Sequence, residues 1–134
     1  MSHHPITAPA HYTVYPVQPI EITRYLGFCL GNAVKYVLRA PYKGEEEDLR
    51  KALQYLHWEA GTPSGPLHAQ AHRVLEERIG DICLFLAEKQ PRHSWFQAAF
   101  LECVGWYAFS GEVRHLANMR SAVEAMLKAM EGKS

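Results

Sequence analysis

Apolar residues recur at intervals of three and four along most of the chain, which is the period of one face of an α-helix. The pattern is strongest over residues 67–89, and the same helical spacing is found over residues 112–130. No stretch of useful length alternates apolar and polar residues as a strand would, and no segment of the sequence is repeated. The pattern therefore predicts an all-α protein.

Proline and glycine divide this pattern into five or six helices. Four prolines in residues 1–19 favour an extended arm, rich in proline and tyrosine, that lies on the body of the protein. Gly27 can end a first short helix, Pro41 is expected to stop a second and to begin a turn, and Pro91 closes the longest. The predicted helices are 20–27, 28–40, 45–60, 67–89, 93–109 and 112–130.

We expect one domain over residues 1–134. Its parts are the arm, a helical motif over 20–60, and additional helices over 67–130 that form the core and an oligomer interface. With 134 residues, 48% of them apolar, the chain can bury one core. The helix 93–109 is nearly apolar all round, including Trp95 and Trp106, so we expect it to be central to the bundle or buried against a second subunit. The second alternative predicts a homo-oligomer.

Charge and composition narrow the possible partners. Lys plus Arg and Asp plus Glu both number 14, so no net field would hold a long nucleic acid, and any bound anion should be small. No apolar run is long enough to cross a membrane, and a secretory leader is not recognisable, which predicts a cytoplasmic protein. Cys29, Cys83 and Cys103 are far apart in apolar sequence and are expected to be buried thiols.

The most informative polar residues lie in the second helix. Asn32, Lys35, Tyr36 and Arg39 follow the spacing i, i+3, i+4 and i+7, so they share one face. Lys and Arg can grip phosphate oxygens, Asn can bond a base or sugar, and Tyr can stack. The next residues of this kind are Lys43, Lys51 and Tyr55. The alternative is an ordinary solvated face, in which the acidic run 45–48 pairs with the basic residues.

Residues 11 to 58 resemble a family of small phage and prophage proteins, the domain of unknown function 3310, whose members are often labelled nucleotide kinases. The resemblance rests on His-Tyr, Glu, Gly-Asn-x-x-Lys-Tyr-x-x-Arg, a downstream Lys, and Asp-Leu-x-Lys-Ala-x-x-Tyr-Leu. These elements fall on His11, Tyr12, Glu21, Gly31, Asn32, Lys35, Tyr36, Arg39, Lys43, Asp48, Leu49, Lys51, Ala52, Tyr55 and Leu56.

The resemblance implies nucleotide chemistry in a phage-infected bacterial cell. The expected activity is phosphorylation of a nucleoside monophosphate, with ATP and Mg²⁺ as the cofactors of a kinase, although the residues identify no catalytic group. The implied ligand-binding residues are His11, Tyr12, Asn32, Lys35, Tyr36, Arg39, Lys43, Lys51 and Tyr55. Two alternatives stay open: a non-catalytic sponge that sequesters a nucleotide signal of anti-phage defence, and a purely structural bundle.

A second group of polar residues follows residue 67. His68, His72 and Glu76 follow one another at i+4, with Asp81 nearby, a spacing that can present two nitrogens and a carboxylate to a metal, although a solvated face is commoner. The segment EERIGDICLFL is also similar to the carboxylate helix of metal-dependent nucleotide pyrophosphatases. Arg78 stands where that helix would carry a metal-binding glutamate, so we rank this reading below nucleotide binding.

Overall fold

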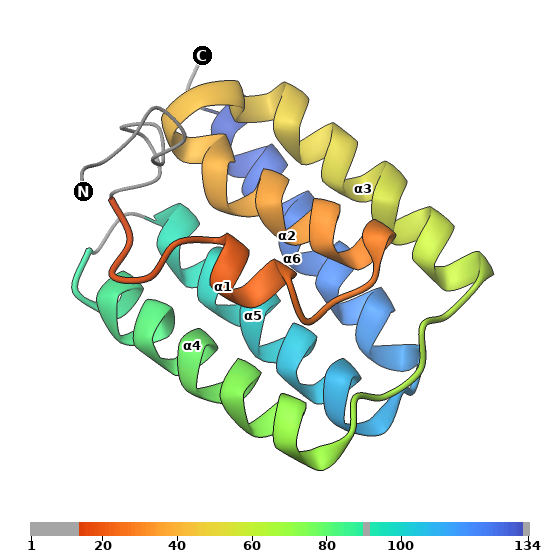
Figure 1. Ribbon diagram of the computed structural model, residues 1–134. Coiled ribbons are helices and arrows are strands. Elements are labelled where there is room, and N and C mark those ends of the chain that lie inside the picture. Colours follow the sequence, from red (N-terminus) through yellow and green to blue (C-terminus); the bar gives the residue numbers. More distant parts are fainter. Residues whose placement is uncertain (1–13, 90–91, 133–134) are drawn as a thin grey trace, which may run out of the picture.

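The computed structural model describes residues 14–89 and 92–132, and this part of the chain is helical and without strands (Figure 1). The predicted all-α class is therefore confirmed. Within the predicted arm, residues 1–13 lie outside the described residues, and residues 14–19 form turns rather than a helix. The elements are α1 (Ile20–Thr23), α2 (Phe28–Arg39), the π-helix η2 (Ala40–Gly44), α3 (Glu45–Gly61), α4 (Ala69–Ala87), α5 (Arg92–Ser110) and α6 (Arg114–Glu131).

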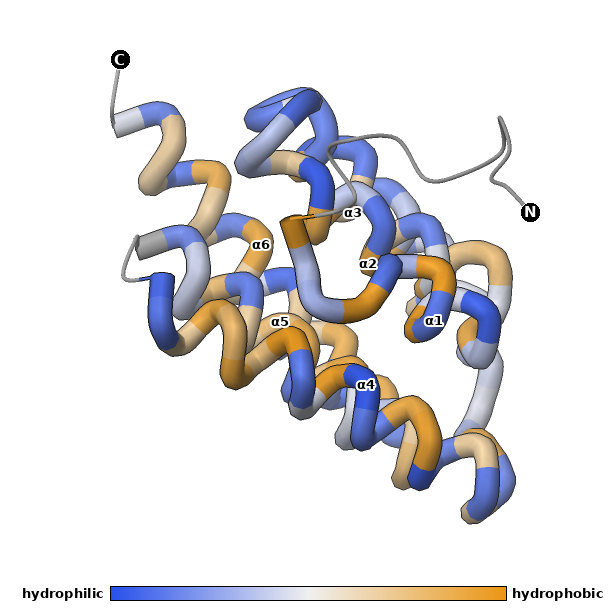
Figure 2. Tube along the Cα trace, turned by 60° about the vertical axis from the view of Figure 1, so that its left-hand side comes forward, coloured by the Kyte–Doolittle hydropathy of each residue, from blue (hydrophilic) through white to orange (hydrophobic). Residues whose placement is uncertain are grey.

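Two antiparallel helix pairs form the body of the molecule. Helices α2 and α3 lie side by side and are joined by η2, while α4 and α5 make a second pair (Figure 1). Helix α6 packs on both α5 and α3, and the short α1 contacts α2 and α4. Hydrophobic residues recur at helical spacing among hydrophilic ones along α4 and α6, whereas α5 is mostly hydrophobic (Figure 2).

Helix α5 is central to the core, as its apolar sequence predicts. Phe100, Leu101, Val104 and Tyr107 of this helix are at most 1% exposed. The same helix also leaves large side chains in solvent, with Trp95 65% exposed. The homo-oligomer expected from this surface stays a prediction. The three cysteines are unbonded and only half-buried, so the expectation that they are buried is only partly met.

The chain stays helical after Pro41, although the sequence predicts a turn after the second helix. The α-helix ends at Arg39, but the chain continues as η2, where the Glu45 N–H donates to the Ala40 carbonyl across a π-turn. Pro41 has no N–H to donate to the carbonyl of Val37, four residues earlier. That carbonyl instead accepts from Nε2 of Gln97 on α5, at 3.0 Å.

Tyr15 completes the same buried junction. Its hydroxyl donates to the Leu38 carbonyl and accepts from Gln97 Nε2 at 3.1 Å. The chain before α1, the end of α2 and the N-terminal third of α5 are thereby fixed to one another. Gln97 Oε1 is buried without a hydrogen-bond partner among the described residues, and nothing in the structure accounts for it.

The α3–α4 loop is fixed to α5 by a buried carboxylate. Glu59 is 2% exposed, and its Oε2 accepts from the Tyr107 hydroxyl at 2.7 Å and from the Ser64 N–H at 2.8 Å. Gly111 follows α5 with φ +73°, and an added Cβ would lie 2.7 Å from Pro66 Cδ. The loop therefore closes one end of the bundle. None of the helices in the described ranges is both long and apolar enough to span a membrane.

Candidate functional site

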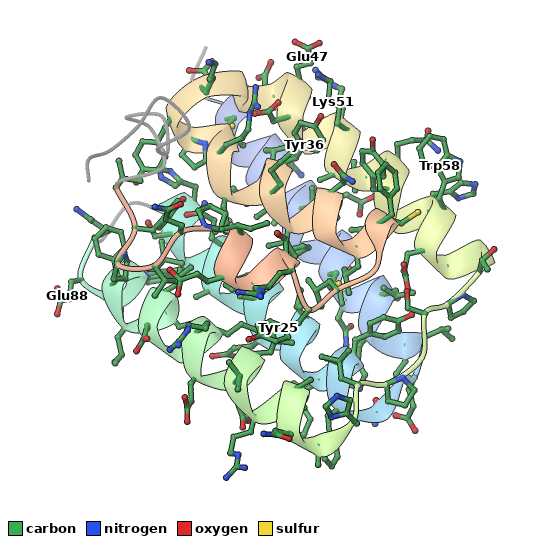
Figure 3. All side chains as sticks on the ribbon, in the orientation of Figure 1. Tyr25, Tyr36, Glu47, Lys51, Trp58 and Glu88 are labelled. Carbon is green, nitrogen blue, oxygen red and sulfur yellow. The ribbon has the colours of Figure 1, made fainter. Side chains whose placement is uncertain are left out.

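Three cationic side chains surround the ring of Tyr36 at the junction of α2 and α3. Lys35 Nζ lies 4.6 Å from the ring centroid, Lys51 Nζ 5.4 Å and Arg39 Cζ 5.6 Å. Figure 3 shows Tyr36 and Lys51 close together on the outer surface of the two helices. The i, i+4 spacing on α2 and the antiparallel approach of α3 bring these groups together. We call Lys35, Tyr36, Arg39 and Lys51 the cation cluster.

Aromatic rings extend the cation cluster along the same two helices. Tyr55 stacks on Tyr36, with centroids 6.0 Å apart and planes inclined by 15°, and it meets Phe28 and Trp58 edge to face. Phe28 is 75% exposed and Trp58 52%, so both present apolar surface to solvent. We call Phe28, Tyr55 and Trp58 the aromatic strip. Sequence reasoning missed Phe28 and Trp58, although each lies one turn from a recognised residue, Asn32 or Tyr55.

Arg39 is held by a buried partner, so it differs from the two lysines. Its Nε donates to Asp48 Oδ2 at 2.8 Å, and the Asp48 side chain is 2% exposed. The carboxylate lies against Gly44, where an added Cβ would come within 2.0 Å of it. Arg39 therefore helps to hold η2 against α3. Replacing Arg39 would therefore remove the counter-charge of a buried carboxylate as well as a candidate phosphate contact.

Asn32 lies beside a small hollow next to the cation cluster. Its Nδ2 donates to the Phe28 carbonyl at 2.8 Å, within its own helix. The hollow has a volume of about 190 Å³ and also borders Lys35, which is thus shared with the cation cluster. Its lining consists of Thr23, Leu26, Gly27, Phe28, Gly31, Asn32 and Lys35.

The remaining predicted ligand residues are not part of this group. Lys43 is exposed on η2 and is not among the side chains in contact with Tyr36. His11 and Tyr12 lie outside the described residues. The structure therefore brings together Lys35, Tyr36, Arg39, Lys51 and Tyr55, with Asn32 at the edge.

The histidines of α4 have local roles. Nδ1 of His68 accepts from the Ala71 N–H at 3.3 Å and caps the helix, while His72 Nε2 lies 3.2 Å from the Gly105 carbonyl oxygen. Glu76 and Asp81 are exposed. Across the ranges that the structure describes, no three His, Cys, Asp or Glu side chains are grouped so that they could hold a metal ion. Arg78 pairs with Glu21 of α1 at 3.3 Å.

The N-terminal part of the chain can be compared with known families. Residues 6–57 match the model of the protein family of unknown function DUF3310. This segment includes α1 and α2, η2 and most of α3, and therefore the whole cation cluster and all of the aromatic strip except Trp58. The description of DUF3310 assigns it no activity. Neither the curated proteins nor the solved structures include a match to the chain.

Proposed function

We propose that the surface formed by α2 and α3 binds a nucleotide, with its phosphates at the cation cluster and its base against the aromatic strip. The observation that carries the proposal is the continuity of the two groups. Tyr36 contacts three cations and also stacks on Tyr55, so charge and exposed ring surface adjoin. A phosphorylated aromatic molecule uses both kinds of contact at once.

Lys35 is the principal phosphate-binding residue in this proposal. The Asp48 carboxylate already offsets the charge of Arg39. Similarly, Glu47 Oε2 lies 3.8 Å from Lys51 Nζ and offsets part of the charge of Lys51. Lys35 has no carboxylate within 4.0 Å among the described residues, and it borders the hollow as well. An ammonium without a counter-charge is the group that gains most from a phosphate.

Phe28 and Trp58 supply the stacking surface for the base. Stacking of a nucleic-acid base on an aromatic side chain contributes about 1–3 kcal/mol, and it tolerates different bases because each has a flat face. Phosphate contacts at Lys35 and ring contacts at Phe28 together favour a nucleotide over a simple anion. Because positive and negative charges balance over the whole chain, a mononucleotide fits better than a long nucleic acid.

Binding, rather than phosphoryl transfer, is what the geometry supports best. A kinase holds its phosphates in a site closed to water and commonly uses Mg²⁺ to stabilise the transferring group. The hollow beside Lys35 is small and open, and Asp48 is occupied by Arg39. We therefore place nucleotide sequestration before the kinase activity that the family resemblance implies.

The test is to incubate the full chain with mono-, tri- and cyclic nucleotides plus Mg²⁺, and to identify by mass spectrometry what is retained and what is converted. Retention without conversion is expected. Conversion of a monophosphate with matching loss of a triphosphate would instead establish the kinase.

Matched variants then locate the site. Lys35→Ala should weaken binding of the retained nucleotide at least tenfold without lowering Tm, whereas Lys128→Ala, at an exposed lysine on α6, should leave the affinity unchanged. Trp58→Ala should weaken nucleotide binding but not the binding of inorganic triphosphate, because it removes ring surface and no charge. Full affinity in Lys35→Ala would refute the assignment.

A further inference from the structure

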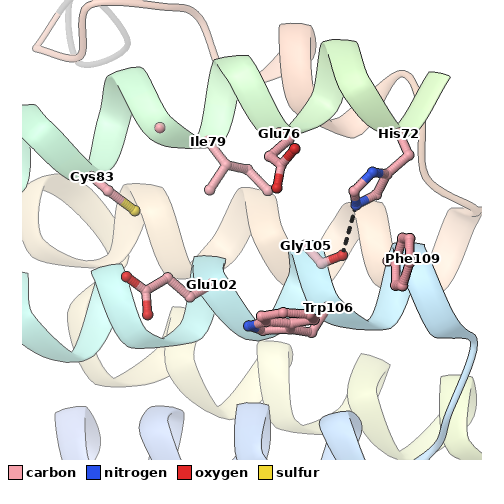
Figure 4. A pocket seen from close by; sticks show the side chains of 9 residues that line it. His72, Glu76, Ile79, Cys83, Glu102, Gly105, Trp106 and Phe109 are labelled. Atoms are coloured by element: carbon pink, nitrogen blue, oxygen red, sulfur yellow. Dashed lines mark hydrogen bonds between the residues drawn. The ribbon is translucent and has the colours of Figure 1, made fainter. Parts of the chain in front are cut away.

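A larger cavity lies between α4 and α5, and it shares no residue with the cation cluster or the aromatic strip. Its volume is about 490 Å³, which is within the usual range for small-molecule sites (Figure 4). The lining residues are His72, Glu76, Ile79, Gly80, Cys83, Glu102, Gly105, Trp106 and Phe109. We call this cavity the α4–α5 groove.

Two glycines keep the α4–α5 groove open. A Cβ added to Gly80 would meet no atom within 4 Å, and one added to Gly105 would meet only Ile79 Cδ1, at 3.8 Å. Side chains at these positions would therefore project into free space rather than clash with the fold. The glycines leave a space between the two helices that a flat molecule can enter.

One end of the groove is aromatic. The rings of His72 and Phe109 lie 5.3 Å apart, and Trp106 meets Phe109 edge to face at 6.5 Å. His72 is held in place by its contact with the Gly105 carbonyl, as Figure 4 shows. Trp106 is 60% exposed and Phe109 63%, so their surfaces are accessible to a ligand.

The ionised groups that line the groove are acidic. Glu76 and Glu102 have neither a hydrogen bond nor an ion pair within the described part of the chain, and no Lys or Arg lines the cavity. Burial, together with the Glu102 carboxylate, raises the pKa of the Cys83 thiol to about 11, so this thiol is neutral at pH 7. Figure 4 shows Glu76 projecting from α4 and Glu102 from α5, on facing walls.

We propose that the α4–α5 groove binds a small organic cation with a flat apolar body. The aromatic rings attract a cation through their faces and cover apolar surface, while the two carboxylates supply its counter-charge. The cavity volume suits a molecule of the size of a substituted aromatic amine. A bare metal ion is a poorer occupant, since the described residues contain no suitable group of three ligands.

Three indole probes of nearly equal size test this assignment: tryptamine is a cation, tryptophol is neutral and indole-3-acetate is an anion. Each is titrated into the ¹⁵N-labelled full chain, and amide shifts are followed. Tryptamine should shift the amides of residues 72–83 and 102–109 and bind at least tenfold more tightly than tryptophol. Indole-3-acetate should not bind. Equal affinities for all three, or shifts confined to other helices, would refute the proposal.

Charge variants separate a specific site from a general preference for cations. The double variant Glu76→Gln with Glu102→Gln should reduce tryptamine affinity to that of tryptophol, while Glu77→Gln, an exposed glutamate of α4 outside the groove, should leave it unchanged. Retained tryptamine affinity in the double variant would overturn the proposal. A second result would also overturn it: tryptamine fails to bind, and the amide shifts of the groove residues depend on protein concentration. A second copy of the chain would then be the occupant of the groove.

Discussion

Arg39 and Lys35 carry the same charge on one face of α2, yet their surroundings give them different roles. The Arg39 guanidinium holds the buried Asp48 carboxylate, and removing it would leave that carboxylate without its counter-charge. Lys35 has no such partner among the described residues. A loss of nucleotide binding in a Lys35 variant can therefore be attributed to the site, whereas the same loss in an Arg39 variant would also reflect a weakened fold.

The sequence predicts which residues share a helical face, but not which of them are already occupied. Helical spacing correctly places Lys35, Tyr36 and Arg39 together, because that spacing follows from backbone geometry alone. The burial of Asp48 depends on how η2 places Gly44 against it, which is a tertiary contact. Lys43 fits the sequence pattern of the resemblance, but its exposed side chain on η2 does not join the cation cluster.

Ionisation of buried tyrosine and cysteine side chains should make the protein less stable at alkaline pH. Burial raises the pKa of Tyr15 and of Tyr107 above the ordinary 10.0, and that of Cys83 from 9.0 to about 11. Between the unfolded and folded pKa values the folded state binds more protons, so the free energy of unfolding decreases as pH rises. For Cys83 the decrease should begin near pH 9 and end near pH 11, and the tyrosines should add to it above pH 10.

Urea unfolding at intervals from pH 7.5 to 11 measures this decrease. The variant Cys83→Ala should show a shallower decrease between pH 9 and 11 than the wild type, whatever its stability at pH 7.5. The control is Cys29→Ala. Identical slopes for the wild type and Cys83→Ala would contradict the assignment.

At the scale of elements, the junction of α2 and η2 shows why a proline can be misread. From the sequence, Pro41 marks the end of a helix, and the α-helix does end two residues before it. The chain then continues as a π-helix, whose cost is offset by side chains that lie far away in the sequence, Gln97 and Tyr15. No local pattern contains that information, so the predicted turn is wrong while the predicted helix end is nearly right.

A double-mutant cycle tests whether Gln97 compensates for the missing N–H of Pro41. Gln97→Met leaves the Val37 carbonyl buried without its donor and should cost about 1–3 kcal/mol in the free energy of unfolding. Pro41→Ala supplies an N–H in the same turn, so Gln97→Met should cost less in that background. The methionine also removes the buried Gln97 Oε1, which has no hydrogen-bond partner among the described residues. Because this removal is favourable, the expected decrease in the free energy of unfolding is at the lower end of that range.

Chemical unfolding of the four proteins measures the coupling between the two positions. A coupling of at least about 0.5 kcal/mol, in the direction of a smaller penalty, is expected for residues that share a partner. Additive effects would mean that Gln97 stabilises the junction in another way.

For the whole molecule, the segment that matches DUF3310 is not a separate structural unit. It ends within α3 at residue 57, and α3 packs against α6, far along the chain. Leu49, Ala52 and Leu56 of α3 are at most 2% exposed. The helical periodicity of residues 67–130 predicts these covering helices but not where they pack, because the sequence alone does not define which faces meet.

A fragment of residues 1–61 should therefore fail to fold by itself, although it contains the cation cluster and the aromatic strip. Its apolar faces would lose α5 and α6, and Val37 would lose the Gln97 amide. Isolated helices of the length of α2, 12 residues, are marginal in water. Circular dichroism should show reduced helicity and no cooperative thermal transition, and the fragment should not bind the nucleotide retained by the full chain. A fragment that unfolded cooperatively near the Tm of the full chain would mean that residues 62–134 are not needed to support the site. Adding a second fragment of residues 62–134 is the complementary experiment. Recovery of both helicity and nucleotide binding would establish that these residues form the covering half of the core.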